Sequence, residues 1–130
     1  MTEEKKSVKI LLVEDDSFLA SVYATKFELE GFTVFHASDG EMGVTMAEKN
    51  DPDIVLLDIL MPKMDGFETL RRLKMDPKLV HIPVVMLTNL GQKEDVERCL
   101  KDGAVDYLIK AHFVPGEAVK KVRKILNLAQ

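Results

Sequence analysis

The stretch IVLLDILMPKMDG, residues 54–66, places the carboxylate of Asp58 directly after a run of four apolar residues. A continuous apolar run of this length is typical of a strand that is buried on both faces. Burying an unpaired carboxylate is costly, so an acid at the tip of such a strand needs a cation or a metal ion beside it. The stretch therefore predicts a buried strand that delivers a functional acid to one edge of a sheet.

Outward from this stretch, the chain alternates short β-rich runs with helical patterns. We expect strands at residues 8–13, 32–37, 53–57, 83–88 and 105–110, and helices at about 16–30, 38–50, 65–76, 93–103 and 115–129. Five successive strand–helix units indicate an α/β fold, with a parallel sheet that is covered by helices on both faces. We expect residues 1–7 to form a flexible tail and residues 8–130 to form one domain.

The helical patterns also predict which residues face the core and where the helices end. Asp16 or Ser17 is suited to cap the first helix, and Gly31 and Gly103 are suited to end the first and fourth helices. The apolar positions that we expect to face inward are Phe18, Val22, Tyr23 or Phe27, and Leu29 in the first helix, the methionines of the second, and Val96, Cys99 and Leu100 in the fourth.

Composition narrows the possible locations and partners. The net charge of −4 disfavours a broad surface for nucleic acid or for an anionic membrane. No apolar run approaches the roughly 20 residues of a membrane span, and the start MTEEKKSVK lacks the apolar core of a signal peptide. The single Cys99 excludes an internal disulfide and agrees with a reducing compartment. We therefore expect a cytoplasmic protein.

Polar residues lie at the carboxyl ends of four of the five expected strands. In open parallel sheets, ligands bind beyond the carboxyl ends of the strands. Crowded carboxylates repel one another unless a cation neutralises them, and oxygen ligands of this kind suit Mg²⁺. A carboxylate can also attack a phosphoryl group, while cations stabilise the transferring oxygens. The residues at this edge are Glu14, Asp15 and Asp16 after the first strand, Asp58 after the third, Thr88 in the fourth and Lys110 in the fifth.

Each of these residues also has a purely structural interpretation. Glu14 and Asp15 are suited to cap a helix, although Asp16 can do so alone. Thr88 is an ordinary β-branched strand residue, and a lysine at a strand end is usually solvated. Tyr107 fits a half-buried strand aromatic, and the three histidines show no spacing typical of metal ligands. The joint position of the polar residues at one edge favours function over these alternatives.

Four segments, ILLVEDDSFL, VLLDILMPKMDG, VVMLT and DYLIK, resemble the receiver domain of bacterial two-component response regulators. The resemblance covers residues 8 to 128. It implies a flavodoxin-like (βα)5 three-layer sandwich with strand order 2-1-3-4-5. It also implies a signalling switch that catalyses its own phosphorylation and dephosphorylation, rather than a dedicated enzyme. By position, Asp58 matches the phosphoacceptor, and the residues that match the Mg²⁺ ligands are Glu14, Asp15, Asp58 and the backbone carbonyl of Leu60. The residues that contact the phosphoryl group in the family correspond to Thr88 and Lys110. Tyr107 matches the switch aromatic, and the loop after the phosphoacceptor is matched at Pro62 and Gly66.

The resemblance further implies partners. A sensor histidine kinase or a histidine phosphotransfer protein would supply the phosphoryl group. The face formed by helix four, strand five and helix five would then change shape and control a downstream effector, or an output domain absent from this chain. Receiver dimers often use the same face, so a homodimer is possible, with Asp106, Lys121 and Arg123 available for pairing across it.

The chain departs from the family in two places. Receivers usually follow the lysine with Pro and Phe, whereas here the sequence is KAHFVPGE, with Ala111 in place of the proline and His112 inserted before Phe113. A non-proline cis peptide bond is costly, so we expect a trans bond after Lys110. Leu60 and Leu90 stand at the two positions whose side chains, in the family that the chain resembles, flank the path of the hydrolytic water. Because leucine cannot orient water, we expect slow self-dephosphorylation.

Three other functions compete with this interpretation. A haloacid dehalogenase-type hydrolase would carry a second Asp two residues after Asp58, where this chain has Leu60. A flavodoxin-like electron carrier would need a phosphate-binding loop after the first strand, and the acids there would repel a flavin phosphate. A degenerate receiver that only docks partners is the third alternative, which the KAHF segment keeps open.

Overall fold

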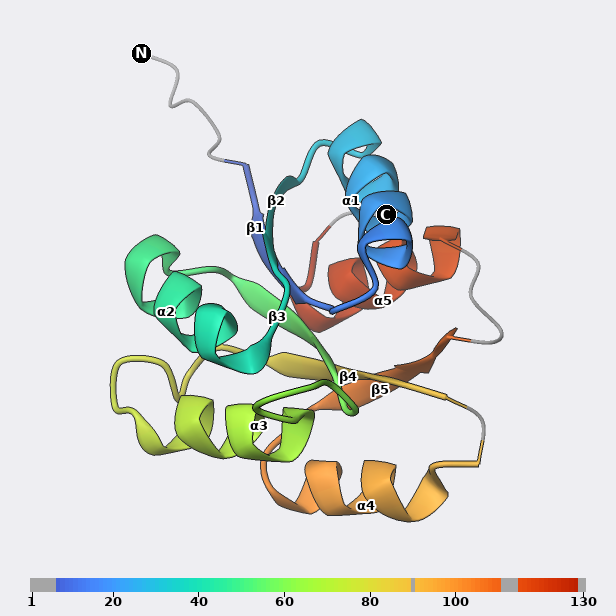
Figure 1. Cartoon of the computed structure of the whole chain (residues 1–130). Helices are drawn as coiled ribbons and strands as arrows, with labels where there is room; N and C mark the ends of the chain where they lie inside the picture. The colour runs from blue at the N-terminus through green and yellow to red at the C-terminus, as the bar shows by residue number, and fades with distance from the viewer. Residues whose placement is uncertain (1–6, 90, 111–114, 129–130) are drawn as a thin grey trace.

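The chain forms a single parallel five-stranded sheet in the order β2-β1-β3-β4-β5 (Figure 1). This computed structural model describes residues 7–89, 91–110 and 115–128. The strands are β1 Lys9–Val13, β2 Thr33–Ala37, β3 Ile54–Asp58, β4 Val84–Thr88 and β5 Asp106–Ile109, and the helices are α1 Ser17–Leu29, α2 Gly40–Asn50, α3 Gly66–Met75, α4 Lys93–Lys101 and α5 Pro115–Ile125. The expected fold class, element order and strand order are confirmed.

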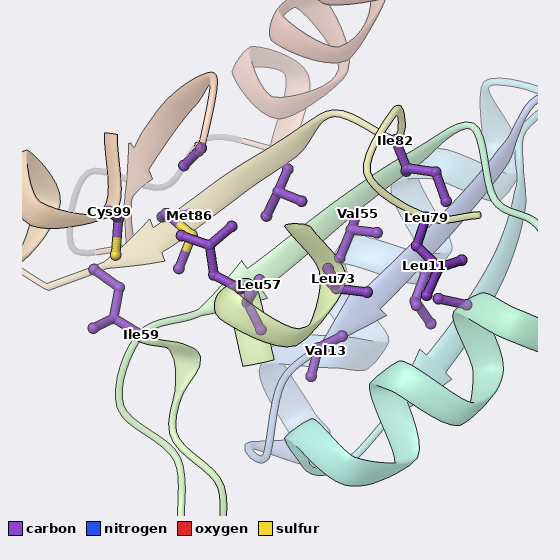
Figure 2. Close-up of a cluster of buried hydrophobic side chains, with 14 of the residues drawn as sticks. Leu11, Val13, Val55, Leu57, Ile59, Leu73, Leu79, Ile82, Met86 and Cys99 are labelled. Atoms are coloured by element: carbon purple, nitrogen blue, oxygen red, sulfur yellow. The ribbon is translucent and has the colours of Figure 1, made fainter. Parts of the chain in front are cut away.

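Helices cover both faces of the sheet, which gives the three layers seen in Figure 1. Because side chains alternate along a strand, Leu11 and Val13 point to one face while Ile10 and Leu12 point to the other. The first face packs against α2, α3 and α4, and Figure 2 shows this core, in which Leu73 of α3 lies over the sheet. The second face packs against α1 and α5.

The central strands are buried along their whole length, as the apolar runs predict. All five residues of β3 and all five of β4 are buried, whereas the edge strands β2 and β5 are half-exposed. The strand β3 includes Asp58, so the acid is its last residue and not the first residue after it. A fully buried and otherwise apolar strand therefore ends directly in the carboxylate.

Aspartates begin three of the helices. The side chain of Asp16 accepts a hydrogen bond from the backbone nitrogen of Leu19 at 3.0 Å, which confirms the expected cap of α1. Asp39 caps α2 and Asp65 caps α3 in the same way. At the other ends, Gly31 and Gly103 have φ values of 95° and 115°, which confirms them as helix stops.

The predicted inward faces of α1, α2 and α4 are partly wrong. Phe18 and Leu29 are 76% and 78% exposed, because α1 buries Ala20, Tyr23 and Phe27 instead. In α2 the exposed fraction of Met42 is 43%, and the small residues Gly43 and Ala47 face the sheet. A Cβ at Gly43 would lie 2.9 Å from Val13 Cγ2, so close packing against β1 requires small residues there. In α4, Val96 and Cys99 are buried as expected, but Leu100 is 40% exposed.

Among the described residues, no helix combines the length and apolar character that crossing a membrane requires.

Candidate functional site

Three carboxylates meet at the carboxyl edge of the sheet. Glu14 and Asp15 directly follow β1, and Asp58 ends the neighbouring strand β3. One carboxylate oxygen from each of the three residues lies within 4.8 Å of the others. Glu14 and Asp58 are only 0% and 3% exposed, whereas Asp15 is open to solvent. The predicted convergence of the acids is therefore present, and two of the three carboxylates are withdrawn from water.

Lys110 supplies a cation to the two buried acids. It follows β5, and its side chain extends past the end of β4 toward β3 and β1. Its Nζ atom lies 2.8 Å from Asp58 Oδ2 and 2.8 Å from Glu14 Oε1. The side chain of Lys110 is only 14% exposed. The loss of the family's proline at position 111 therefore does not keep the amine from this edge.

The electrostatics of the cluster show an excess of buried negative charge. Burial raises the pKa of Glu14 to about 7, although hydrogen bonds from Lys110 and from the backbone of Asp16 oppose the shift. Burial likewise raises the pKa of Asp58, again against the hydrogen bond from Lys110. For Lys110, burial alone would lower the pKa, but the hydrogen bonds to Asp58 and Glu14 raise it. One ammonium thus only partly compensates three carboxylates, and an oxygen-rich cluster of this kind fits a divalent cation.

The backbone and one histidine hold Glu14 in place. Its Oε2 atom accepts a hydrogen bond from the backbone nitrogen of Asp16 at 3.1 Å. The backbone carbonyl of Glu14 lies 2.7 Å from Nε2 of His36 on β2, so the ring donates from Nε2. From the sequence, His36 shows only that it lacks the spacing typical of metal ligands. Its contact with Glu14 depends on the register of β2 beside β1, which no local motif in the sequence reveals.

Thr88 lies at the same edge, but its hydroxyl is engaged elsewhere. The residue ends β4 and is 2% exposed. Its Oγ1 atom lies 2.9 Å from Gln92 Oε1 and 3.2 Å from the carbonyl oxygen of Asn89, both in the segment that leads to α4. The structure thus brings Thr88 to the predicted edge, with its hydroxyl bonded to this segment. Gln92 was not anticipated from the sequence, and its only signal there is its position four residues after Thr88.

Tyr107 lies beside an open groove between α4 and β5. Its side chain is 38% exposed, and the ammonium of Lys121 lies 5.6 Å from its ring centroid. The groove has a volume of about 420 Å³, and its lining includes Thr88, Gln92, Val96, Leu100, Tyr107 and Ile109. Tyr107 is therefore partly exposed, and it lies beside an open groove.

The loop after β3 packs tightly against the end of that strand. The backbone nitrogen of Gly66 donates a hydrogen bond to the carbonyl oxygen of Ile59 at 2.7 Å. A Cβ at Gly66 would clash with the backbone of Asp58 and would lie 2.6 Å from Ile59 Cα. Pro62 is exposed, and Leu60 is 54% exposed. The glycine is thus required for the approach of α3 to Asp58.

Two other expectations concern the charged residues of α5 and the residues that lie outside the described part of the chain. Lys121 pairs with Asp106 at 3.1 Å and Arg123 pairs with Glu30 at 3.0 Å, both within the chain. Each of these residues therefore has a partner within the chain, and their pairing across a homodimer stays a prediction. Leu90, Ala111, His112 and Phe113 lie outside the described residues, and so does the expected trans bond after Lys110.

Comparison with known proteins identifies the family. The model of the response regulator receiver domain matches residues 10–123, and the chain belongs to this family. Its members accept phosphoryl groups in two-component signalling. This membership argues against the dehalogenase-type and flavodoxin-like alternatives.

Individual relatives agree with the family. The chain is 38% identical over 119 residues to the DNA-binding dual master transcriptional regulator RpaA of Synechocystis, covering 92% of this chain and 49% of that protein. It superposes on chemotaxis protein CheY4 of Vibrio cholerae with a TM-score of 0.86 and 27% identity, covering 92% and 99% of the two chains. The receiver domain of sensor histidine kinase PA1611 from Pseudomonas aeruginosa, solved with a magnesium ion in its active site cleft, gives a TM-score of 0.85 and 29% identity over 94% and 99%. The chain spans about half of RpaA and of several other curated relatives.

Proposed function

We propose that this receiver domain is a Mg²⁺-dependent phosphorylation switch with Asp58 as the phosphoacceptor. The observation that carries the proposal is the pairing of Asp58 with Lys110 at 2.8 Å, at the end of an otherwise apolar strand. A buried acid paired with a lysine has little structural purpose at the rim of a sheet, and it is suited to nucleophilic chemistry.

In the proposed reaction, a histidine kinase or a histidine phosphotransfer protein presents a phosphohistidine to Asp58. A carboxylate oxygen of Asp58 forms a bond to phosphorus while the bond between phosphorus and the imidazole nitrogen breaks. The electron pair of the broken bond stays on the imidazole, which can then take up a proton. Lys110 favours the ionised form of Asp58 before transfer and would neutralise a phosphoryl oxygen afterwards. The same site would later admit water to hydrolyse the acyl phosphate.

The residues that would hold Mg²⁺ are Glu14, Asp15, Asp58 and the backbone carbonyl of Leu60. Mg²⁺ usually takes only one or two carboxylates directly and keeps several waters, so the three carboxylates could share one ion with one of them acting through a bound water. Their uncompensated charge is a second reason for a cation here. When bound, the ion would neutralise phosphoryl oxygens during transfer. The magnesium-containing receiver of PA1611 supports this assignment by analogy.

Phosphorylation would change the surface of the domain through Thr88 and Tyr107. The phosphoryl group adds negative charge and acceptor oxygens, which draw the Thr88 hydroxyl toward Asp58. The groove beside Tyr107 offers space into which its ring can turn. The face made by α4, β5 and α5 would then favour a different set of contacts, as a population shift between two states.

The proposed output is protein-mediated. The switching face would act on a downstream effector, on an output domain outside these residues, or on a second copy of the chain. RpaA is a DNA-binding regulator, but the net charge of −4 leads us to propose no direct nucleic-acid contact for this domain. Residues 8–130 as the domain, residues 1–7 as a tail and a cytoplasmic location remain predictions.

The experiment that tests this function is incubation with acetyl phosphate, followed by intact-mass measurement. We expect one phosphoryl adduct that requires Mg²⁺ and that is lost in Asp58→Asn. Failure of the wild-type protein to form an adduct, with Mg²⁺ bound, would instead favour a receiver that only docks partners.

A further inference from the structure

Gln92 forms a hydrogen-bonded bridge between the end of β4 and the start of α4. Its Oε1 atom lies 2.9 Å from Thr88 Oγ1 and 2.6 Å from the backbone nitrogen of Asn89. Its Nε2 atom lies 3.4 Å from Asp95 Oδ2 in the first turn of α4. Because Asn89 N can only donate and the Asp95 carboxylate accepts, these contacts fix which end of the Gln92 carboxamide is the oxygen.

The side chain of Gln92 does not cap α4, although Gln92 stands at the N-cap position of that helix. Gln92 occupies the N-cap of α4, but it makes no side-chain cap hydrogen bond to that helix. At the equivalent position of α1, α2 and α3, an aspartate caps its own helix. The Gln92 side chain instead reaches back to Thr88 and Asn89. The orientation of the Gln92 side chain is therefore explained by its hydrogen bonds to Thr88 and Asn89 and not by the capping of α4.

We propose that Gln92 is a positioning residue that holds the Thr88 hydroxyl in its resting orientation and couples its release to the first turn of α4. The single hydroxyl proton of Thr88 is directed toward the β4–α4 segment, with Gln92 Oε1 at 2.9 Å and the Asn89 carbonyl oxygen at 3.2 Å, so it must turn away from Gln92 to reach a phosphoryl group on Asp58. Gln92 therefore competes with the phosphoryl group for this proton. This part of the inference rests on the proposed function.

Release of Thr88 would also alter the groove beside Tyr107. Gln92 and Thr88 both line this groove, together with Val96, Tyr107 and Ile109. When the hydroxyl leaves, Gln92 Oε1 loses one of its two donors, and the contact of Nε2 with Asp95 becomes free to rearrange. The switch would thus reach α4 directly, in parallel with any rotation of Tyr107.

The first part of the proposal is that Gln92 orients the Thr88 hydroxyl in the unphosphorylated protein. This part can be tested without phosphorylation. In Gln92→Met, which keeps the length of the side chain but lacks the acceptor, NMR couplings should show the Thr88 χ1 rotamer redistributing. Exchange of the Asn89 amide hydrogen should also accelerate. Gln92→Glu restores an acceptor oxygen and should keep both signals near those of the wild type. An unchanged Thr88 rotamer in folded Gln92→Met would overturn the proposal.

The second part of the proposal is that Gln92 and the phosphoryl group compete for the hydroxyl proton of Thr88. It is tested by binding of beryllofluoride, a phosphoryl mimic, with Mg²⁺ present. Loss of one neutral hydrogen bond to the resting state predicts roughly two- to tenfold tighter binding by Gln92→Met. The effect should vanish in a Thr88→Val background, and Lys93→Met, in the same turn, should bind as the wild type does. Unchanged affinity, or an effect that persists with Val at 88, would overturn the proposal. If the wild type bound no beryllofluoride, the proposed function would fail, while the Thr88 rotamer would still decide the role of Gln92.

Discussion

The ammonium of Lys110 lies 2.8 Å from the carboxylate of Asp58, although the strands that carry them are separated by β4. The same ammonium contacts Glu14, so one lysine joins the ends of three strands. This pairing explains how an apolar strand can end in an acid, because the charge is partly neutralised before any metal or phosphoryl group binds.

Replacing Lys110 by Met should slow adduct formation from acetyl phosphate by on the order of 100-fold, because a preorganised cation for the phosphoryl oxygens is lost. The initial rate, followed by intact mass, checks this. Lys120→Met, at an exposed position of α5, is the matched control and should react at the wild-type rate. A Lys110→Met protein that reacts within twofold of the wild type would contradict the assigned role.

The buried Glu14 predicts a specific pH dependence in the absence of divalent cations. Burial raises its pKa from the ordinary value of 4.5 to about 7, so between these values the folded state retains a proton that the unfolded state has lost. The free energy of unfolding should therefore fall as the pH rises through this window, by on the order of 2 kcal/mol. Urea denaturation of wild type and Glu14→Gln, measured across the window, isolates this contribution. Parallel curves for the two proteins would show that Glu14 is not the group responsible.

Mg²⁺ should stabilise the folded domain, because a ligand that binds only the folded state raises the midpoint of thermal unfolding with concentration. In Asp15→Asn, the apparent affinity taken from this titration should fall by at least tenfold. Asp15 is exposed, so its replacement leaves the metal-free stability nearly unchanged. Equal Mg²⁺ responses of the two proteins would remove Asp15 from the ligand set.

The exposed Leu60 predicts a long-lived phosphoryl group. Its side chain cannot orient the hydrolytic water, so Leu60→Asn combined with Leu90→Glu should shorten the half-life of the adduct several-fold. The measurement is the decay of the adduct mass after removal of acetyl phosphate. An unchanged decay rate would refute the argument.

The tight approach of α3 to β3 predicts that Gly66→Ala is destabilising. The added methyl group would meet the backbone of Asp58 and Ile59, so a loss of roughly 2 kcal/mol or more is expected. Gly116→Ala is the matched control, because nothing lies within 4 Å of its added Cβ, and it should be neutral or slightly stabilising. Urea denaturation of both variants tests the difference, and equal stabilities would contradict the packing argument.

The sequence predicts most of this architecture because its apolar runs mark the strands and its helix stops mark the ends of the helices between them. The ends of β1, β3, β4 and β5 carry residues whose chemistry is meaningful only together, and the parallel sheet brings them to one edge. The convergence of Glu14, Asp58 and Lys110 could therefore be predicted once the strands were recognised.

Other features depend on contacts that periodicity does not encode. In α1, Phe18 and Leu29 share the apolar character of Tyr23 and Phe27, and only packing against the sheet selects which pair is buried. The bond between Thr88 and Gln92 depends on the course of the segment between β4 and α4, where no sequence motif is evident. The internal pairing of Lys121 with Asp106 likewise follows from how α5 lies beside β5.

The most direct test of the central claim is to locate the phosphoryl group chemically. After incubation with acetyl phosphate and Mg²⁺, borohydride reduces an aspartyl phosphate to homoserine, which peptide mass spectrometry can place in the sequence. The account predicts homoserine at position 58 alone, and none when Mg²⁺ is omitted. Reduction at Asp15 or at another acid, with position 58 unmodified, would contradict it.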